Sequence, residues 1–138
     1  MFNTETKEWT PGPKMKEKRV YHSCFYDIKS NSVFVIGGWN GTRLATTEKW
    51  NLDTNKWEST PSLPEALSFS AGVVSKSLDY IGFVAGGNTG GFVTGGTTNK
   101  IFGLRRRDLN WEVMPQQLQT ARAGHSMVNL PTDQVPGC

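Results

Sequence analysis

The stretch VFVIGG, residues 33–38, decides the fold, because a similar stretch returns 49 residues later as IGFVAGG, residues 81–87. Each is an apolar run that ends in two glycines. A run that is apolar throughout, rather than alternating with polar residues, is typical of a strand whose sheet is covered on both faces. The repeat therefore predicts small sheets that pack against each other.

Tryptophan marks the same period outside these stretches. Trp9, Trp57 and Trp111 are separated by 48 and 54 residues, and a proline follows each of them four positions later. The longer second spacing places an insertion in the glycine-rich segment near residues 88–99, where a long turn is expected. Three matches at one offset indicate an internal repeat of about fifty residues.

A third marker precedes the apolar runs. It is a polar residue that lies 13, 13 and 14 residues after the preceding tryptophan: His22, Ser70 and His125. Both histidines belong to an Arg-x-x-His-Ser sequence, which starts at Arg19 and at Arg122. The middle copy departs from it, since Leu67 stands in place of the arginine. We expect the two histidines to have equivalent scaffold roles, such as a buried hydrogen bond.

Strand and turn signals alternate within one copy of the repeat, residues 14–60. The expected strands cover residues 19–27, 32–36, 46–52 and 56–59. Asn40-Gly41 and residues 53–55 supply turn chemistry, because Asn, Asp and Gly tolerate a positive φ. Helix has little support, so the chain is expected to be all-β.

The order of these features resembles the kelch repeat, whose copies are the blades of a β-propeller. The order is Arg-x-x-His, apolar strand, Gly-Gly, Asn-Gly turn, and an aromatic residue seven positions before tryptophan, as in Trp50 and Trp57. The resemblance implies an all-β fragment of a kelch-type β-propeller, with two complete four-stranded blades and partial blades at both ends. Because propellers close with roughly four to eight blades, this incomplete propeller is expected to be part of a longer chain.

The resemblance also implies how the repeat divides the chain. Residues 1–13 would end a partial blade, residues 14–60 and 61–114 would form the complete blades, and residues 115–138 would begin a further one. The insertion near 88–99 falls in the second complete blade. The residues expected to build the repeated scaffold are Arg19, His22, Gly37, Gly38, Trp50, Trp57, Gly86, Gly87, Trp111, Arg122 and His125.

Charge and composition argue against several kinds of partner. The 15 Lys and Arg residues against 12 Asp and Glu residues give a net charge of +3. Only residues 105–107 form a basic cluster, so no nucleic-acid partner is expected. The longest apolar runs, residues 33–36 and 80–85, are far shorter than the ~18 residues of a membrane span. Cys24 and Cys138 match no zinc-binding spacing.

The sequence also lacks a recognisable catalytic or cofactor motif. Two histidines at equivalent positions of a repeat make no catalytic triad, and the glycine pairs lack the lysine of a phosphate-binding loop. Tyr21, His22 and Cys24 are residue types that form the copper site of galactose oxidase, a kelch-like propeller. Neighbouring residues on a strand, however, point to opposite faces. We expect no metal, no cofactor and no catalytic residue.

Two loops are candidates for contact with a partner, because function concentrates on loops that a rigid scaffold holds. One contains Trp39, which is expected to be exposed, together with Asn40 and Arg43; tryptophan and arginine are common interface anchors. The other is the glycine-rich insertion, with Asn88 and Phe92. Asn40 also begins an Asn-Gly-Thr glycosylation sequon, which matters only in a secreted protein.

The resemblance implies a non-catalytic module that binds a protein partner through its blade loops, such as a substrate receptor of a ubiquitin ligase or a cytoskeletal binder. Two alternatives stay open, an extracellular kelch-repeat adhesion protein and a fragment of a galactose-oxidase-like enzyme. The sequence does not fix the compartment: a cytoplasmic location is favoured, and a secreted one stays open.

Overall fold

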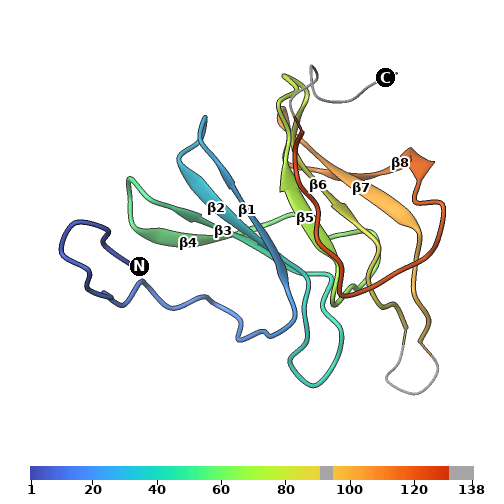
Figure 1. The fold of residues 1–138 in the computed structure, drawn as a ribbon, viewed down its shortest axis with the longest axis horizontal. Helices are drawn as coiled ribbons and strands as arrows, with labels where there is room; N and C mark the ends of the chain where they lie inside the picture. Colours follow the sequence, from blue (N-terminus) through green and yellow to red (C-terminus); the bar gives the residue numbers. More distant parts are fainter. Residues whose placement is uncertain (91–94, 131–138) are drawn as a thin grey trace.

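The computed structural model describes residues 1–90 and 95–130, and within them it has two four-stranded antiparallel sheets (Figure 1). The first sheet contains β1 (Ser23–Asp27), β2 (Ser32–Ile36), β3 (Thr47–Asn51) and β4 (Lys56–Thr60). The second contains β5 (Ala71–Val74), β6 (Tyr80–Ala85), β7 (Lys100–Arg105) and β8 (Trp111–Gln117). Each strand pairs with the next one along the chain. The prediction of an all-β fold with two four-stranded sheets is confirmed.

The first strand is shorter than the sequence predicts. β1 begins at Ser23 rather than at Arg19, because the chain bends at Tyr21, which has a φ of 55°. Val20, before the bend, pairs with Trp39 instead of with β2. In the second sheet β8 extends to Gln117, three residues beyond the expected blade end at 114.

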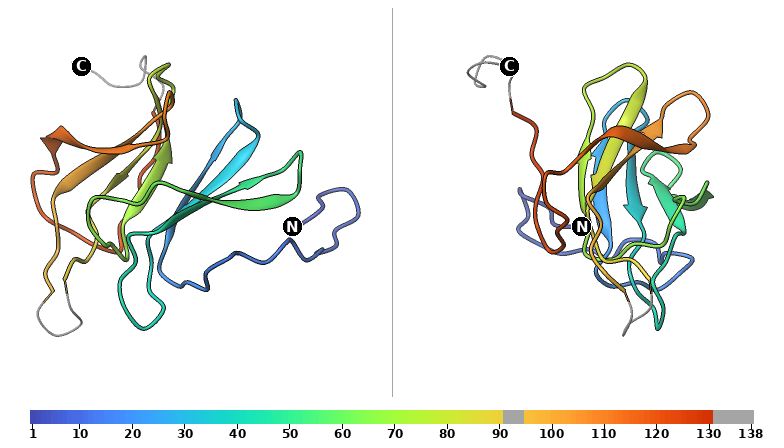
Figure 2. Two further views of the ribbon diagram at one scale, coloured as in Figure 1. Left: turned by 180° about the vertical axis from the view of Figure 1, so that it is seen from behind. Right: turned by 90° about the vertical axis from the view of Figure 1, so that its right-hand side faces the viewer.

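The hydrophobic core lies between the two sheets, where β1 packs against β5 and β6 (Figures 1 and 2). It is formed by Phe25, Phe34, Ile36, Leu63, Leu67, Ile81, Val84, Phe102, Leu104 and Trp111. The ring of Phe25 fits because the second sheet has glycine opposite it. A Cβ atom on Gly82 would lie 2.7 Å from Cζ of Phe25. Fully burying one such side chain contributes about 1.5–3 kcal/mol, so this interface accounts for much of the stability.

One ion pair also joins the sheets, at the end where the β1–β2 turn lies. The Arg106 guanidinium donates to both carboxylate oxygens of Asp27, at 3.0 and 3.1 Å. Burial alone would raise the pKa of Asp27, but hydrogen bonds from Arg106 and Ser30 outweigh burial and lower it. Asp27 therefore stays ionised and holds the second sheet to the first.

The backbone repeats as regularly as the sequence. Left-handed residues occur immediately before each copy of the third sequence marker: Tyr21 at 55°, Phe69 at 57° and Gly124 at 68°. They occur again two residues before each repeated tryptophan: Lys7 at 60°, Asn55 at 55° and Leu109 at 57°. Phe2 pairs with Trp9 as Trp50 pairs with Trp57. The repeat therefore continues on both sides of the two complete sheets.

The second glycine of each Gly-Gly pair connects neighbouring repeats. The amide of Gly38 donates to the carbonyl oxygen of Leu67 at 2.7 Å, and the amide of Gly87 donates to that of Arg122 at 2.8 Å. Gly38 and Gly87 have φ values of 105° and 108°, which L-residues rarely adopt. These hydrogen bonds hold one end of each sheet against the chain segment that enters the next repeat.

A pair of glycine variants tests how much the close packing of Gly38 against the segment that enters its own sheet contributes. Gly38 and Gly41 have nearly the same φ, 105° and 109°, but a Cβ on Gly38 would lie 2.7 Å from the Val20 carbonyl oxygen, whereas one on Gly41 meets nothing within 4 Å. Gly41→Ala should cost about 1–2 kcal/mol from backbone strain alone. Gly38→Ala should cost roughly 1–3 kcal/mol more, from overpacking. Urea unfolding measures both, and equal costs would contradict the packing role.

Candidate functional site

The loops predicted to contact a partner gather at one end of the two sheets, the lower end in Figure 1. The β2–β3 loop, residues 37–46, and the described parts of the β6–β7 loop, residues 86–90 and 95–99, lie there side by side in Figures 1 and 2. The β1–β2 and β5–β6 turns lie at the opposite end. Both sheets therefore contribute loops to the same end of the molecule.

A pocket of about 240 Å³ lies at this end, where the two repeats meet. It is lined by Tyr21, Trp39, Arg43, Ser68, Phe69 and Asn88. The backbones of Ser68 and Asn88 exchange two hydrogen bonds, of 2.7 and 3.2 Å, and fix its floor. Its lining combines aromatic rings with one cation and one amide, which are groups that commonly anchor a protein partner.

Tyr21 and Phe69 form the exposed aromatic edge of the pocket. Their rings stack with centroids 4.1 Å apart and planes 19° from parallel. The amide of Phe69 donates to the carbonyl oxygen of Tyr21 at 2.9 Å, so the backbone also holds the two residues together. The side chains nevertheless remain 55% and 38% exposed. The stack is therefore rigid and accessible at once.

Arg43 spans from the loop of the first sheet to the loop of the second. Its guanidinium carbon lies 5.7 Å from the centre of a Trp39 ring, in cation–π geometry. Its Nη1 donates to the carbonyl oxygen of Gly90. Two contacts thus fix the guanidinium at the edge of the pocket.

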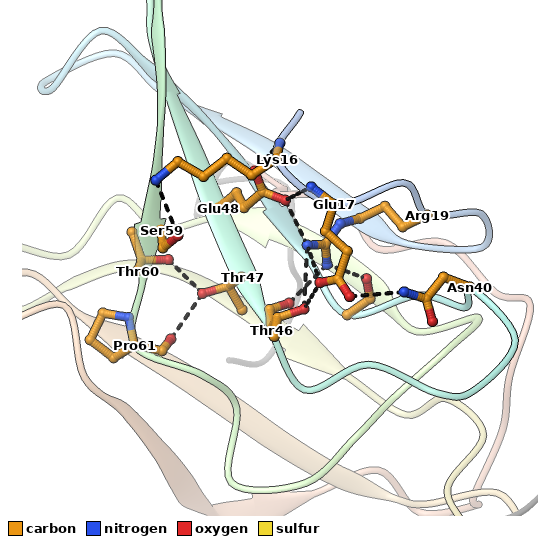
Figure 3. Close-up of polar contacts among 11 residues, drawn as sticks. Lys16, Glu17, Arg19, Asn40, Thr46, Thr47, Glu48, Ser59, Thr60 and Pro61 are labelled. Atoms are coloured by element: carbon orange, nitrogen blue, oxygen red, sulfur yellow. Dashed lines mark hydrogen bonds and ion pairs between the residues drawn. The ribbon is translucent and has the colours of Figure 1, made fainter. Parts of the chain in front are cut away.

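The structure brings together three of the five predicted contact residues, Trp39, Arg43 and Asn88. Trp39 is half-buried rather than exposed, because its backbone pairs with Val20 and its side chain lies beside Arg43. Asn40 is exposed and does not line the pocket, and its side-chain nitrogen donates to Glu17 at 2.8 Å (Figure 3). Phe92 lies outside the described residues. Glycosylation at Asn40 stays a prediction.

The sequence reasoning missed Tyr21, Ser68 and Phe69 as pocket residues. The sequence did contain a signal for two of them. Tyr21 and Phe69 directly precede His22 and Ser70, two of the three repeated polar residues, whereas Gly124 precedes the third, His125. A position that holds an aromatic residue in two copies and glycine in the third does not look like a core position of the repeat. The φ values explain the glycine, because all three residues adopt a left-handed backbone conformation.

The scaffold residue Arg19 is enclosed by acceptors (Figure 3). Its Nη1 donates to the carbonyl oxygens of Gly37 and Thr46 at 2.7 and 2.9 Å, and its Nη2 lies 2.8 Å from Glu48. The side chains of Arg19 and Glu48 are only 0% and 3% exposed. Glu48 also accepts hydrogen bonds from the amides of Lys16 and Glu17. Arg19 therefore joins the incoming chain to the Gly-Gly segment and to β3.

The second sheet replaces this ion pair with an apolar pair. Leu67 stands at the position of Arg19, and the strand register places Phe102 at the position of Glu48, opposite Val84. Leu67 and Phe102 are both 0% exposed and belong to the core. The departure of the middle copy from the arginine pattern is therefore compensated within the same repeat.

The tryptophans show how packing varies along the repeat. Trp50 stacks on Trp57 with ring centroids 5.9 Å apart, and Nε1 of Trp57 donates to the carbonyl oxygen of Pro13 at 2.8 Å. Trp111 is buried in the core. Trp9, by contrast, is 78% exposed and touches the ring of Phe2.

The two repeated histidines lie against glycines of the scaffold. The His22 Cβ lies 3.1 Å from where a Cβ on Gly38 would be, and the His125 ring comes within 2.6 Å of one on Gly86. Burial, and secondly the charge of Arg19, lowers the pKa of His22. Burial likewise lowers the pKa of His125. Neither His125 nitrogen has a hydrogen-bond partner among the described residues, so its role is packing rather than the expected hydrogen bond.

Metal binding by Tyr21, His22 and Cys24 finds no support in this geometry. Tyr21 stacks on Phe69 at the pocket, whereas His22 and Cys24 line a separate apolar groove with Trp57. Within residues 1–90 and 95–130, no group of three or more His, Cys, Asp or Glu side chains could hold a metal ion. The same residues include no helix that is long and apolar enough to cross a membrane.

Comparison with known proteins identifies the repeat. Residues 29–64 match the family model of the Kelch motif. The chain is 35% identical over 69 residues to Kelch-like protein 23 of Mus musculus, covering 48% of this chain and 12% of that protein. It is 26% identical over 135 residues to the Kelch repeat-containing protein kel-10 of Caenorhabditis elegans, covering 94% and 22%.

A third relative combines kelch repeats with another domain. The chain is 27% identical over 86 residues to a RING finger domain and kelch repeat-containing protein of Dictyostelium discoideum, covering 62% of this chain and 8% of that protein. The chain thus spans between 8% and 22% of the length of these three relatives.

Coupled variants test the Arg19 ion pair. Glu48→Phe and Arg19→Leu alone should each cost about 3–5 kcal/mol, because each leaves a buried charge without its closest partner. The double variant Arg19→Leu with Glu48→Phe copies the apolar pair of the second sheet and should recover most of that loss. Urea unfolding of the single and double variants measures the coupling. If the stability losses of the two single variants simply add in the double variant, the Leu67–Phe102 pair is not equivalent to the Arg19–Glu48 pair.

Histidine titration should also be visible in stability. Because the pKa values of His22 and His125 are lowered in the folded chain, the unfolded chain binds more protons as the pH falls through about 6.5. The free energy of unfolding should therefore decrease from pH 7 to pH 5. His22→Asn and His125→Asn should each reduce this slope in urea titrations. Unchanged slopes would show that the histidines are not responsible.

Proposed function

Since the chain belongs to the kelch-repeat family, we propose that it is a non-catalytic module that binds a protein partner at the loop end of its two blades, in the pocket between them. One observation carries this proposal. Tyr21 and Phe69 are exposed aromatic residues held in a left-handed backbone conformation. Local backbone preference does not account for large apolar side chains at these two positions.

The third copy of the repeat shows which residue suits the backbone at this position. Gly124, at the equivalent position, has a φ of 68° and adopts this conformation without strain. An L-residue there costs about 1–2 kcal/mol. Both residues also stay partly exposed, 55% for Tyr21 and 38% for Phe69. Strained residues gather at functional sites, so this pair supports a binding role.

The surroundings of the pair support the same role. Trp39 and Arg43 lie at the same pocket, and aromatic residues and arginine dominate the binding energy of protein interfaces. The pocket also draws its residues from both blades, so the packed core fixes its shape before a partner arrives. A preformed site loses less conformational entropy on binding.

The finer role that we propose is selection of a protein substrate for a ubiquitin ligase. The relative that combines a RING finger domain with kelch repeats supports this role, and a cytoskeletal binder is the alternative. The two roles predict different behaviour of the captured proteins, which the abundance of these proteins in cells measures. A ligase substrate should accumulate when the proteasome is inhibited, whereas an unchanged level of every captured protein would contradict the ligase role.

Replacement of Phe69 by glycine tests the binding site directly. Phe69→Gly relieves the backbone strain but loses the stack on Tyr21, so the free energy of unfolding should change by about 1 kcal/mol or less. Capture of proteins by chemical cross-linking should fall about tenfold or more, because truncation of an interface anchor costs at least 1–2 kcal/mol. Quantitative mass spectrometry of the captured proteins provides the measurement.

A matched control uses an exposed apolar residue at the opposite end. Leu78, in the β5–β6 turn, is 79% exposed. Leu78→Ser should leave both stability and capture unchanged. If Phe69→Gly captures the same proteins as the unmodified chain, or if Leu78→Ser loses them, the binding site does not lie at the loop end.

A further inference from the structure

Asn40, Gly41 and Thr42 form the exposed tip of the β2–β3 loop. No other asparagine in the sequence precedes a glycine. The antiparallel bridge between Trp39 and Arg43 closes the loop directly next to this tip. Asparagine is one of the chemically labile side chains, and glycine has no side chain to shield the nitrogen that follows it in the chain. The tip therefore combines a labile carboxamide with an unshielded main-chain nitrogen.

The surroundings of Gly41 leave its nitrogen accessible. Its amide donates no hydrogen bond among the described residues, and a Cβ atom placed on Gly41 would meet nothing within 4 Å. Among the same residues, one hydrogen bond holds the Asn40 side chain, from Nδ2 to Glu17 at 2.8 Å. Glycine also adopts more backbone conformations than other residues, so the tip can turn the Gly41 nitrogen toward Cγ of Asn40.

We propose that Asn40 is a site of spontaneous deamidation, and that this reaction alters the binding pocket. The Gly41 nitrogen loses its proton and attacks Cγ of Asn40. A C–N bond forms, the bond from Cγ to Nδ2 breaks, and ammonia leaves with a proton taken from water. A further water molecule then opens the five-membered succinimide at either carbonyl, which restores the N–H and leaves a carboxylate. The products are aspartate and isoaspartate, and the only co-reactant is water.

The new carboxylate would face Glu17, whose oxygens are already engaged (Figure 3). Oε1 of Glu17 accepts the hydrogen bond from Asn40, whereas Oε2 accepts one from Thr46 and lies 3.2 Å from Nη2 of the buried Arg19. An ionised aspartate has no N–H to donate, and two facing carboxylates repel each other. Because Arg19 and Thr46 hold Glu17, we expect residue 40 to move away from it.

This change reaches the pocket through the two ends of the tip. Trp39 and Arg43 line the pocket, and their bridge spans residues 40–42. Isoaspartate adds one carbon atom to the main chain inside this bridge, so the hydrogen bond from the Leu44 amide to Gly38, 2.9 Å long, should weaken. The effect on partner binding rests on the proposed function, whereas the reaction itself does not.

Ageing of the purified chain at mildly alkaline pH tests the reaction, with protein made in bacteria so that Nδ2 of Asn40 carries no glycan. Peptide mapping by mass spectrometry should find aspartate and isoaspartate at position 40. Cation-exchange chromatography should separate a form whose net charge has fallen by one from +3. Conversion should be faster at higher pH, because the attacking nitrogen must lose its proton.

Asn31 is the matched control within the same chain. It precedes Ser32, which is buried in β2, and its side chain is bonded to Tyr26 and Asp53. Conversion at Asn31 should be far slower than at Asn40. Equal rates at the two positions, or no conversion at Asn40, would overturn the proposal.

Two variants test the route. Gly41→Ala adds a methyl group that hinders the attacking nitrogen, and Asn40→Gln requires a larger ring, so both should retain the amide during ageing. Circular dichroism confirms that both variants fold. Conversion of Gly41→Ala at the unmodified rate would contradict attack by the Gly41 nitrogen.

The consequence for the loop has its own measurements. Hydrogen exchange of the Leu44 amide should be faster in the aged chain than in the fresh chain, and should stay unchanged when Gly41→Ala is aged. Unchanged exchange in a fully deamidated chain would overturn the effect on the pocket. Cross-linking capture of proteins should also fall on ageing. Faster exchange with undiminished capture would uphold the inference and instead contradict the proposed binding site.

Discussion

The hydrogen bond from the second glycine of each Gly-Gly pair to the next repeat is the interaction on which the structure depends. Gly38 donates to Leu67, and Gly87 donates to Arg122, with nearly equal geometry. The donating glycines adopt a conformation that L-residues rarely adopt, and a Cβ on the first glycine of each pair, Gly37 or Gly86, would lie 2.5 Å from the accepting carbonyl oxygen. The bonds fix where one sheet meets the next, so the core between the sheets and the loops at their end are positioned together.

The binding pocket follows from this constraint. The bend that brings the chain into each sheet lies beside the Gly-Gly pair, and its left-handed residue points away from the core. Where that residue is glycine, as at Gly124, the bend adds nothing to the surface. Where it is Tyr21 or Phe69, the same bend presents an aromatic ring to solvent. A position that the fold needs only for its backbone thus becomes available for recognition.

Much of the fold could be predicted from the sequence, because repetition and apolar patterning are local properties. The apolar run at 33–36 and the glycine pair that ends it located β2. The left-handed bend at Tyr21 could not be predicted, since an aromatic residue gives no sign of a positive φ, and the expected first strand was therefore too long. The substitution of Arg19 and Glu48 by Leu67 and Phe102 was likewise hidden, because only the strand register pairs these positions.

The candidate site was only partly predictable for the same reason. Trp39 and Arg43 stood out as loop residues, but Tyr21 lay within an expected strand and Phe69 was not singled out. Only the three-dimensional bend places these two residues at the surface. Binding at this site therefore depends on a loop end that the glycine hydrogen bonds hold rigid before any partner binds. Hydrogen–deuterium exchange of the Gly38 and Gly87 amides tests this most directly. Exchange as slow as global unfolding is the predicted result, and exchange as fast as in the exposed loop residues 40–42 would contradict it.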